Sequence, residues 1–305
     1  MKLRIVSFFL AAALLLMTAC SGSPSESSSG GESSAAPQSS EGTSQSPDSS
    51  SDSSEDESSQ SQASQAESSA SKNESASSTP QSGSDGEIPY ALPESTRAAD
   101  SYFDDAVFIG DSVSLKLERY TTQQRSSNPG FFGKAQFLTA GSMGSGNALE
   151  APSSDSIHPL YNGQKMALAD AVKASGAKKV YIMLGMNDMA VYGVDGAVSN
   201  METLIEGILE KTPDAQIFVE SATPLVASKN ISSHKLNNTN LFSYNQKLSA
   251  LCKEKGWYFV NVWSTVDDGT GNLKTSYCSD PDDMGIHFTD AGCEAWIEYL
   301  YTHTA

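Results

Sequence analysis

Basic side chains are scarce in this sequence of 305 residues: 19 Lys and Arg stand against 37 Asp and Glu, and the formal net charge is −18. A nucleic-acid partner requires a basic face that neutralises phosphates, so this balance excludes nucleic acid as a partner. It also disfavours electrostatic adhesion to anionic lipid. Residues 21–85 carry −10 and the first 20 residues carry +2, so −10 of the total charge belongs to residues 86–305.

Cysteine is also scarce, with four residues in the whole chain. Beyond Cys20 the number is odd, so the remaining three cannot all pair within the chain, and their spacing matches no metal-binding pattern. Cys252 lies in a segment with helical spacing and is expected to pack in the core. For Cys278 and Cys293, a disulfide and two free thiols both stay open. No cluster of His, Asp or Glu has the spacing of metal ligands, so neither a metal nor a cofactor is expected.

A long apolar run is missing as well. The longest one, residues 5–17, follows Lys2 and Arg4 and is too short to span a bilayer comfortably. Small residues directly before Cys20 are typical of a bacterial lipoprotein processing site, so we expect residues 1–19 to be a lipoprotein signal peptide. Cys20 would then carry lipid and attach an extracytoplasmic protein to the cell membrane. An ordinary secretory signal is the alternative.

Aromatic residues are absent from residues 21–85, where 29 of 65 residues are serine. Such a segment cannot bury enough apolar surface to offset the entropy lost on ordering. We therefore expect a disordered acidic tether over residues 20–87, with an r.m.s. reach of roughly 45 Å. Only the last part of the chain, residues 100–305, has the composition of a folded domain.

That last part alternates between apolar runs and segments of helical spacing, which predicts a parallel sheet covered on both faces. We expect an α/β fold of three layers, an α/β/α sandwich with a five-stranded parallel sheet of flavodoxin-like type. The expected strands are 106–109, 135–138, 179–184, 216–220 and 257–262, and the main expected helices are 113–120, 165–175, 195–211, 241–255 and 289–301.

Three polar clusters follow expected strands or precede the last helix: Gly110-Asp111-Ser112, Gly185-Met186-Asn187-Asp188 and Gly285-Ile286-His287. Ligands of such sheets bind at the carboxyl ends of the strands, so these clusters should meet. His287 would take the proton of Ser112, whose oxygen would attack an ester carbonyl, and Asn187 would donate to the oxyanion. Asp111 and Asp188 are expected to bond to neighbouring backbone.

These blocks, in this order, resemble the SGNH hydrolase superfamily, also called GDSL-type esterases, over residues 104–303. The resemblance implies a serine esterase in which Ser112 is the nucleophile and His287 the base. It also implies an oxyanion hole formed by Ser112, Gly144 and Asn187. Gly141 is the alternative to Gly144 for the second block.

The sequence departs from the family pattern at the acid of the triad. The resemblance places an aspartate three residues before the histidine, where this chain has Met284. Asp283 is our first candidate, with a loop that is one residue longer. Asp280 or Asp282, and a Ser–His dyad aided by a backbone carbonyl, are the alternatives.

The expected substrate is an acylated carbohydrate or another small ester. The expected location favours O-acyl groups on cell-envelope polysaccharide, most simply acetyl, cleaved by a monomer. Two other functions stay open: an O-acyltransferase that uses the same serine and histidine, and a catalytically silent, lipid-anchored glycan-binding module. The second of these rests on Met284 alone.

Overall fold

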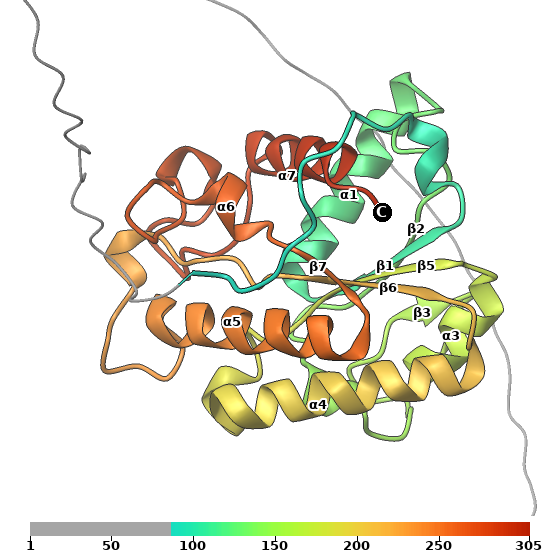
Figure 1. The fold of residues 1–305 in the computed structure, drawn as a ribbon, viewed down its shortest axis with the longest axis horizontal. Coiled ribbons are helices and arrows are strands. Elements are labelled where there is room, and N and C mark those ends of the chain that lie inside the picture. Colours follow the sequence, from blue (N-terminus) through green and yellow to red (C-terminus); the bar gives the residue numbers. More distant parts are fainter. Residues whose placement is uncertain (1–86) are drawn as a thin grey trace, which may run out of the picture. The chain divides into compact units, whose positions relative to one another are not determined.

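The computed structural model describes residues 87–305. The expected signal peptide, Cys20 and all but the last residue of the expected tether lie outside the described residues. Residues 106–305 contain five parallel strands in one sheet with helices on both faces, so the predicted α/β/α sandwich is confirmed (Figure 1). Within residues 87–305, no helix combines the length and the apolarity that a membrane span requires.

The main sheet has the strand order β2-β1-β5-β6-β7, and every neighbouring pair is parallel. The chain adds β2 on one side of β1 and then adds β5, β6 and β7 on the other side. This is the flavodoxin-like arrangement. The strands are β1 (Ala106–Gly110), β2 (Gln136–Thr139), β5 (Lys179–Met183), β6 (Gln216–Glu220) and β7 (Tyr258–Val260). A crevice at the carboxyl ends of β1 and β5 is therefore the expected ligand position.

Two groups of helices cover the sheet. Figure 1 shows α1, α6 and α7 over one face, and α3, α4 and α5 over the other. The α-helices are α1 (Ser112–Ser127), α2 (Ser145–Ala148), α3 (Leu168–Ser175), α4 (Met189–Lys211), α5 (Asn238–Lys255), α6 (Trp263–Val266) and α7 (Asp290–Thr302). Three 3₁₀ turns, η1 (Asp100–Phe103), η2 (Ala227–Lys229) and η3 (Thr275–Tyr277), complete the helical elements of residues 87–305.

A row of aromatic rings crosses the sheet on one face. One ring comes from each strand, and neighbouring rings stack with centroids 4.4 to 5.5 Å apart. The row is Phe137, Phe108, Tyr181, Phe218 and Tyr258. The strand register brings these residues level with one another, so each ring packs on the next across the strands. This row fixes the relative height of the five strand ends, where the polar clusters follow.

The helix boundaries follow local capping. Thr289 accepts a hydrogen bond from the backbone of α7, and Asn237 does the same for α5. Gly176 and Gly256 end α3 and α5 in the left-handed conformation. These caps are visible in the sequence, which is why it predicts the ends of these helices well.

Three elements differ from the sequence prediction. Residues 160–165 form a small antiparallel hairpin of β3 (Leu160–Tyr161) and β4 (Gln164–Lys165), so α3 begins at Leu168 and not at residue 165. Helix α4 begins at Met189, six residues earlier than predicted, and is kinked at Gly193, whose φ of 64° no regular helix contains. The third is α1, which continues to Ser127, seven residues beyond the predicted end.

Candidate active site

Ser112 is the first residue of α1, directly after strand β1. Asp111 caps this helix, since its Oδ1 accepts a hydrogen bond of 2.9 Å from the backbone N–H of Val113. A side chain at Gly110 would place its Cβ 2.0 Å from Ser114 Oγ, so only glycine lets the helix start this close to the strand end. The sequence Gly-Asp-Ser thus places the Ser112 hydroxyl at the sheet edge, with its backbone N–H at the positive end of α1.

His287 lies in the loop before α7 and reaches Ser112 from there. Its Nε2 is 2.9 Å from Ser112 Oγ, which is hydrogen-bond distance for proton transfer. Its Nδ1 is 2.7 Å from Asp280 Oδ2. The structure therefore places a hydroxyl, an imidazole and a carboxylate in a row, each within hydrogen-bond distance of the next. This is the geometry of a serine-hydrolase triad.

Asp280 is held by four donors. Its Oδ2 faces the imidazole, while its Oδ1 accepts from the backbone N–H groups of Ile286 and His287 at 3.1 and 3.0 Å, and from the Cys278 thiol at 3.3 Å. Partial burial raises the pKa of the Asp280 carboxyl, but the hydrogen bonds from His287, both ring and backbone, and from Cys278 outweigh it, so the pKa is lowered. Asp280 is thus kept ionised beside the ring whose cation it would stabilise.

The first candidate for the acid, Asp283, is corrected to Asp280. Residues 280–285 form a tight turn in which the Asp280 carbonyl accepts from the backbone of Asp283 at 3.0 Å and of Gly285 at 2.9 Å. Gly285 closes the turn with a φ of 72°. This turn directs the chain back so that residue 280 meets the imidazole, and it leaves Asp282, Asp283 and Met284 exposed. The spacing to His287 is seven residues because four extra residues fit inside the turn.

Asn187 follows β5 and contacts Asp111, the residue before Ser112. Its Nδ2 donates to Asp111 Oδ2 and to the Met143 carbonyl, both at 3.1 Å. Gly185, with a φ of 125°, makes the turn that brings Asn187 there, and the Tyr244 ring occupies the space where a side chain would be. The amide is therefore fixed beside the nucleophile, and both of its hydrogens have acceptors within the protein.

Gly144 lies at the start of α2, against the β5 loop. A Cβ there would come within 2.8 Å of Asp188 Oδ1, so the close approach requires glycine. The Gly144 N–H donates to Asn147 Oδ1 at 2.9 Å. Gly141, the alternative for this position, is exposed, and a Cβ added to it would meet nothing within 4 Å. Of the two glycines, Gly144 is the one that packs against the site.

Asp188 connects these two loops. Its carboxylate is buried, and it accepts from the backbone N–H of Ser145 at 2.8 Å and of Gly146 at 2.9 Å. The sequence favours bonds from Asp188 to neighbouring backbone. The bonded N–H groups instead lie more than forty residues away in the sequence. Asp188 therefore positions the Gly144 loop relative to Asn187, a role that only the tertiary structure reveals.

Asp111 is a second buried carboxyl beside the nucleophile. Burial raises its pKa to about 6, against the opposing hydrogen bond from Val113 and the attraction of His287. The nearby Asp188 adds to the rise. Asp111 therefore differs from Asp280: it caps α1 and orients the Asn187 amide, and its own charge is disfavoured.

The three cysteines of the described residues and His158 lie inside the protein. Cys252, Cys278 and Cys293 are free thiols, and all three are buried. His158 is buried, with its Nδ1 3.0 Å from Ser156 Oγ. In residues 87–305, no three His, Cys, Asp or Glu side chains are grouped as metal ligands would be.

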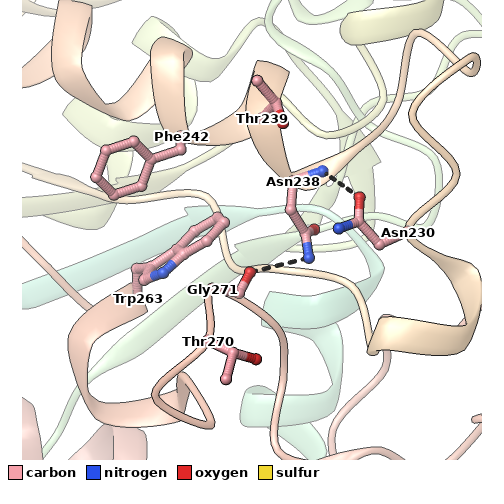
Figure 2. Close-up of a pocket in the computed structure, with 7 residues that line it drawn as sticks. All are labelled: Asn230, Asn238, Thr239, Phe242, Trp263, Thr270 and Gly271. Carbon is pink, nitrogen blue, oxygen red and sulfur yellow. Dashed lines mark hydrogen bonds between the residues drawn. The ribbon is translucent and has the colours of Figure 1, made fainter. Parts of the chain in front are cut away.

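A separate cavity of about 60 Å³ lies beside α5 and α6 (Figure 2). Its aromatic side is formed by Phe242 and Trp263, whose rings meet edge to face. The asparagine side chains on its other side already have hydrogen-bond partners within the protein. Asn238 Nδ2 donates to the Gly271 carbonyl at 3.0 Å, and Asn230 Oδ1 accepts from the Asn238 backbone at 2.9 Å. Substrate sites are typically several hundred Å³. This cavity is smaller than that, and none of Ser112, Asn187 and His287 lines it.

The model of the GDSL-like Lipase/Acylhydrolase family matches residues 108–295. The chain belongs to this family. It is accordingly a serine hydrolase that acts on ester bonds. The match includes the residues that the structure brings together, Ser112, Gly144, Asn187, Asp280 and His287.

Several solved structures are similar to this GDSL-like acylhydrolase. A GDSL-like lipase from Bacteroides thetaiotaomicron is 18% identical, with 65% of this chain and 86% of that chain covered and a TM-score of 0.47. A lipase/acylhydrolase from Enterococcus faecalis is 14% identical, with 64% and 93% covered and a TM-score of 0.45. An acetyl xylan esterase is 12% identical, with 64% and 97% covered and a TM-score of 0.47. No curated protein matches the chain significantly.

Proposed function

We propose that this GDSL-like acylhydrolase is an extracytoplasmic esterase that removes O-acyl groups, most simply acetyl, from cell-envelope polysaccharide. The observation that carries the esterase part is the aligned series Ser112, His287 and Asp280, with gaps of 2.9 and 2.7 Å. The location and the polysaccharide rest on the sequence: the apolar run over residues 5–17, Cys20 shortly after it, and the long serine-rich stretch that follows.

The reaction begins at the Ser112 hydroxyl. Its oxygen attacks the ester carbonyl carbon while His287 Nε2 takes the proton, and Asp280 stabilises the imidazolium that forms. The tetrahedral intermediate then collapses, and His287 gives the proton to the leaving alcohol. A water molecule attacks the acyl-enzyme with the same base, releases the acid and restores Ser112.

The negative oxygen of the intermediate needs donors on the side opposite His287. The Ser112 N–H at the start of α1 is one, and the Gly144 N–H and the Asn187 amide are the others. Asn147 Oδ1 holds the Gly144 N–H in the free enzyme, and Asp111 and Met143 hold the Asn187 amide. In the proposed mechanism the oxyanion shares these donors with their present acceptors, which keep them aimed before the substrate arrives.

The geometry removes the support for one of the two alternative functions and does not distinguish the other from hydrolysis. A silent glycan-binding module has only Met284, in the position of the acid, in its favour. Asp280 takes the place beside the imidazole, so that support is gone. An O-acyltransferase would use the same three side chains, and it differs only in whether a sugar hydroxyl or water receives the acyl group.

The test uses the full-length protein, wild type beside Ser112→Ala. We expect a fluorophosphonate probe to label the wild type and not the variant. Acetate release from an O-acetylated wall glycan should fall at least about 1000-fold in the variant, because the nucleophile is lost. Equal labelling of both proteins would contradict the assignment of Ser112. Labelling without acetate release would retain the esterase and reject the acetylated glycan. Transfer of acetyl to added sugar in place of release would favour the acyltransferase.

A further inference from the structure

The acid and the base of the triad lie at the two ends of one hairpin. The Ser279 N–H donates to the His287 carbonyl at 2.8 Å, and an antiparallel bridge joins the two residues just outside this pair. Asp280 and His287 therefore lie opposite each other where the paired part of the hairpin ends. We call the residues between them, 281–286, the hairpin tip.

The hairpin tip determines where the Asp280 carboxylate points. Its Oδ1 accepts from the Ile286 N–H at 3.1 Å and from the His287 N–H at 3.0 Å. The backbone N–H groups of Asp283 and Gly285 in turn hold the Asp280 carbonyl. If the tip opened, the Ile286 N–H would move away, and the carboxylate would be free to rotate from the imidazole.

The tip has few contacts of its own that would keep it closed. Asp282, Asp283 and Met284 are exposed, so their side chains gain little from burial. Together with Asp280, the tip also places three carboxylates within four residues, and their like charges repel one another. A surface turn of this kind opens readily unless other parts of the protein hold it.

The loop after β6 supplies contacts that hold the tip. The Val226 N–H donates to the Gly285 carbonyl at 2.9 Å, and Lys229 Nζ donates to the Asp282 carbonyl at 2.6 Å. The stem of Lys229 also packs on Gly285, where an added Cβ would lie 2.6 Å from Lys229 Cγ. Lys229 therefore contacts the tip both at its middle and near its end.

The loop that carries Lys229 is itself fixed to α5. Asn238, labelled in Figure 2, is buried, and its Oδ1 accepts from the Leu225 N–H at 2.8 Å while its Nδ2 donates to the Leu225 carbonyl at 3.0 Å. The Lys229 N–H donates to the Val226 carbonyl at 3.0 Å. Lys229 thus extends from an anchored support, so its bond to Asp282 sets the position of the tip.

We infer that Lys229 is a positioning residue of this esterase: it holds the hairpin tip closed and thereby keeps the Asp280 carboxylate aligned with His287. Lys229 acts through Asp280 and not on the ester. The inference rests on the Ser112–His287–Asp280 mechanism of the proposed function and is independent of the glycan substrate.

Lys229→Met in the full-length protein tests this role. Methionine keeps most of the stem that packs on Gly285 and removes the ammonium donor. We expect kcat for a short-chain ester to fall about three- to tenfold, which corresponds to a hydrogen bond of ordinary net strength. KM should stay within about twofold, because the lost contact does not involve the ester. Lys229→Arg keeps an N–H donor and should restore most of kcat.

Lys165→Met is the matched control. Lys165 is half-buried like Lys229, and its Nζ also donates to loop carbonyls, those of Ser154 at 2.8 Å and Ser156 at 2.5 Å. Its loop contains no residue of the triad, so kcat should not change. A loss of kcat in Lys165→Met as large as that in Lys229→Met would overturn the inference.

The Asp280→Asn background separates positioning from general support of the fold. If Lys229 acts through Asp280, adding Lys229→Met to Asp280→Asn should lower kcat by less than about 1.5-fold. The same factor in both backgrounds, or a kcat of Lys229→Met equal to that of the wild type, would overturn the inference. Absence of both ester turnover and fluorophosphonate labelling in the wild type would instead contradict the proposed function itself.

Discussion

Asp280 and Glu220 are two carboxyl groups that each face the N–H of an aromatic ring. Asp280 Oδ2 lies 2.7 Å from His287 Nδ1, and Glu220 Oε1 lies 2.8 Å from Trp296 Nε1. Their protonation nevertheless differs. The pKa of Asp280 is lowered, whereas burial raises the pKa of Glu220 to about 8 against the single opposing bond from Trp296. Glu220 is fully buried and has one donor, whereas Asp280 is only partly buried and has four, and together these two differences decide which carboxyl stays charged.

The two carboxyls act on the same segment. Phe288 follows His287 and packs edge to face on Trp296, with ring centroids 5.8 Å apart. Asp280 therefore holds the imidazole directly, while Glu220 holds the tryptophan against which the next residue packs. Asp280 is thus the ionised partner of a catalytic cation, whereas Glu220 is a neutral group that makes a structural contact.

Removal of the Asp280 charge should have the largest effect. In Asp280→Asn the neutral amide does not stabilise the imidazolium. Its NH₂ group also favours the ring tautomer in which Nε2, and not Nδ1, carries the proton. We expect kcat for ester hydrolysis to fall by about 10³- to 10⁴-fold, with KM changed little. Steady-state kinetics with a short-chain ester measure this.

Asp283→Asn is the matched control for that substitution. It makes the same chemical change in the same turn, on an exposed side chain that does not face the imidazole, and kcat should stay within about twofold. A comparable loss in both variants would show that the turn as a whole, and not the Asp280–His287 bond, supports the reaction.

The second prediction concerns Glu220→Gln. Glutamine keeps the shape and the acceptor for Trp296 but has no titrating proton. In the wild type the folded state holds a proton up to about pH 8, while the unfolded chain releases it near 4.5. Stability from this group is therefore fully present below pH 4.5 and is lost as the pH rises to about 8. The variant does not lose this stability. The difference between its melting temperature and that of the wild type should therefore change in favour of the variant as the pH rises over that interval.

Thermal unfolding of both proteins between pH 5 and pH 9 measures the difference. The limiting slope is about 1.4 kcal/mol per pH unit, which corresponds to roughly 3 to 6 °C per pH unit for a domain of this size. Asp111, whose pKa is about 6, contributes equally to both proteins and cancels in the comparison. Parallel curves would show that Glu220 is ionised in the folded protein.

The sheet and most helices could be predicted from sequence because their signals are local. Apolar runs such as 179–184 and 216–220 end at turn residues, and caps such as Gly176 and Gly256 mark helix ends. The hairpin of β3 and β4 could not be predicted, because its two strands have two residues each and no apolar pattern. The kink at Gly193 could not be predicted either, since a helical apolar spacing starts only after it.

The nucleophile and base could be placed from sequence because each lies beside a strand or helix end. The acid could not, because its position depends on how the turn over residues 280–285 closes. Counting residues back from His287 favours Asp283, but the backbone bonds at the Asp280 carbonyl set a different path. The role of Asp188 is hidden from the sequence for a similar reason, since its partners are brought near only by the packing of two loops.

The smallest expected effect belongs to Cys278, the one side chain besides His287 that donates to Asp280. Burial raises the pKa of its thiol to about 11, so the thiol stays protonated and donates to Asp280 Oδ1 at 3.3 Å. A thiol is a weak donor, and two backbone N–H groups on the same oxygen remain after Cys278→Ala. We expect kcat to fall less than about threefold. With one donor fewer the pKa of Asp280 rises, so the stability lost on acidification should be lost at a slightly higher pH.

Cys252→Ala is the control, because Cys252 is also buried and its substitution removes the same volume without a carboxylate contact. Acid unfolding of the two variants beside wild type separates the lost donor from the lost packing. A shift in Cys278→Ala that Cys252→Ala does not show assigns it to the S–H bond. If Cys278→Ala instead lowered kcat as far as Asp280→Asn, the two backbone donors would not suffice to keep Asp280 charged. The contrast with Glu220 would then depend on the kind of donor and not on the number.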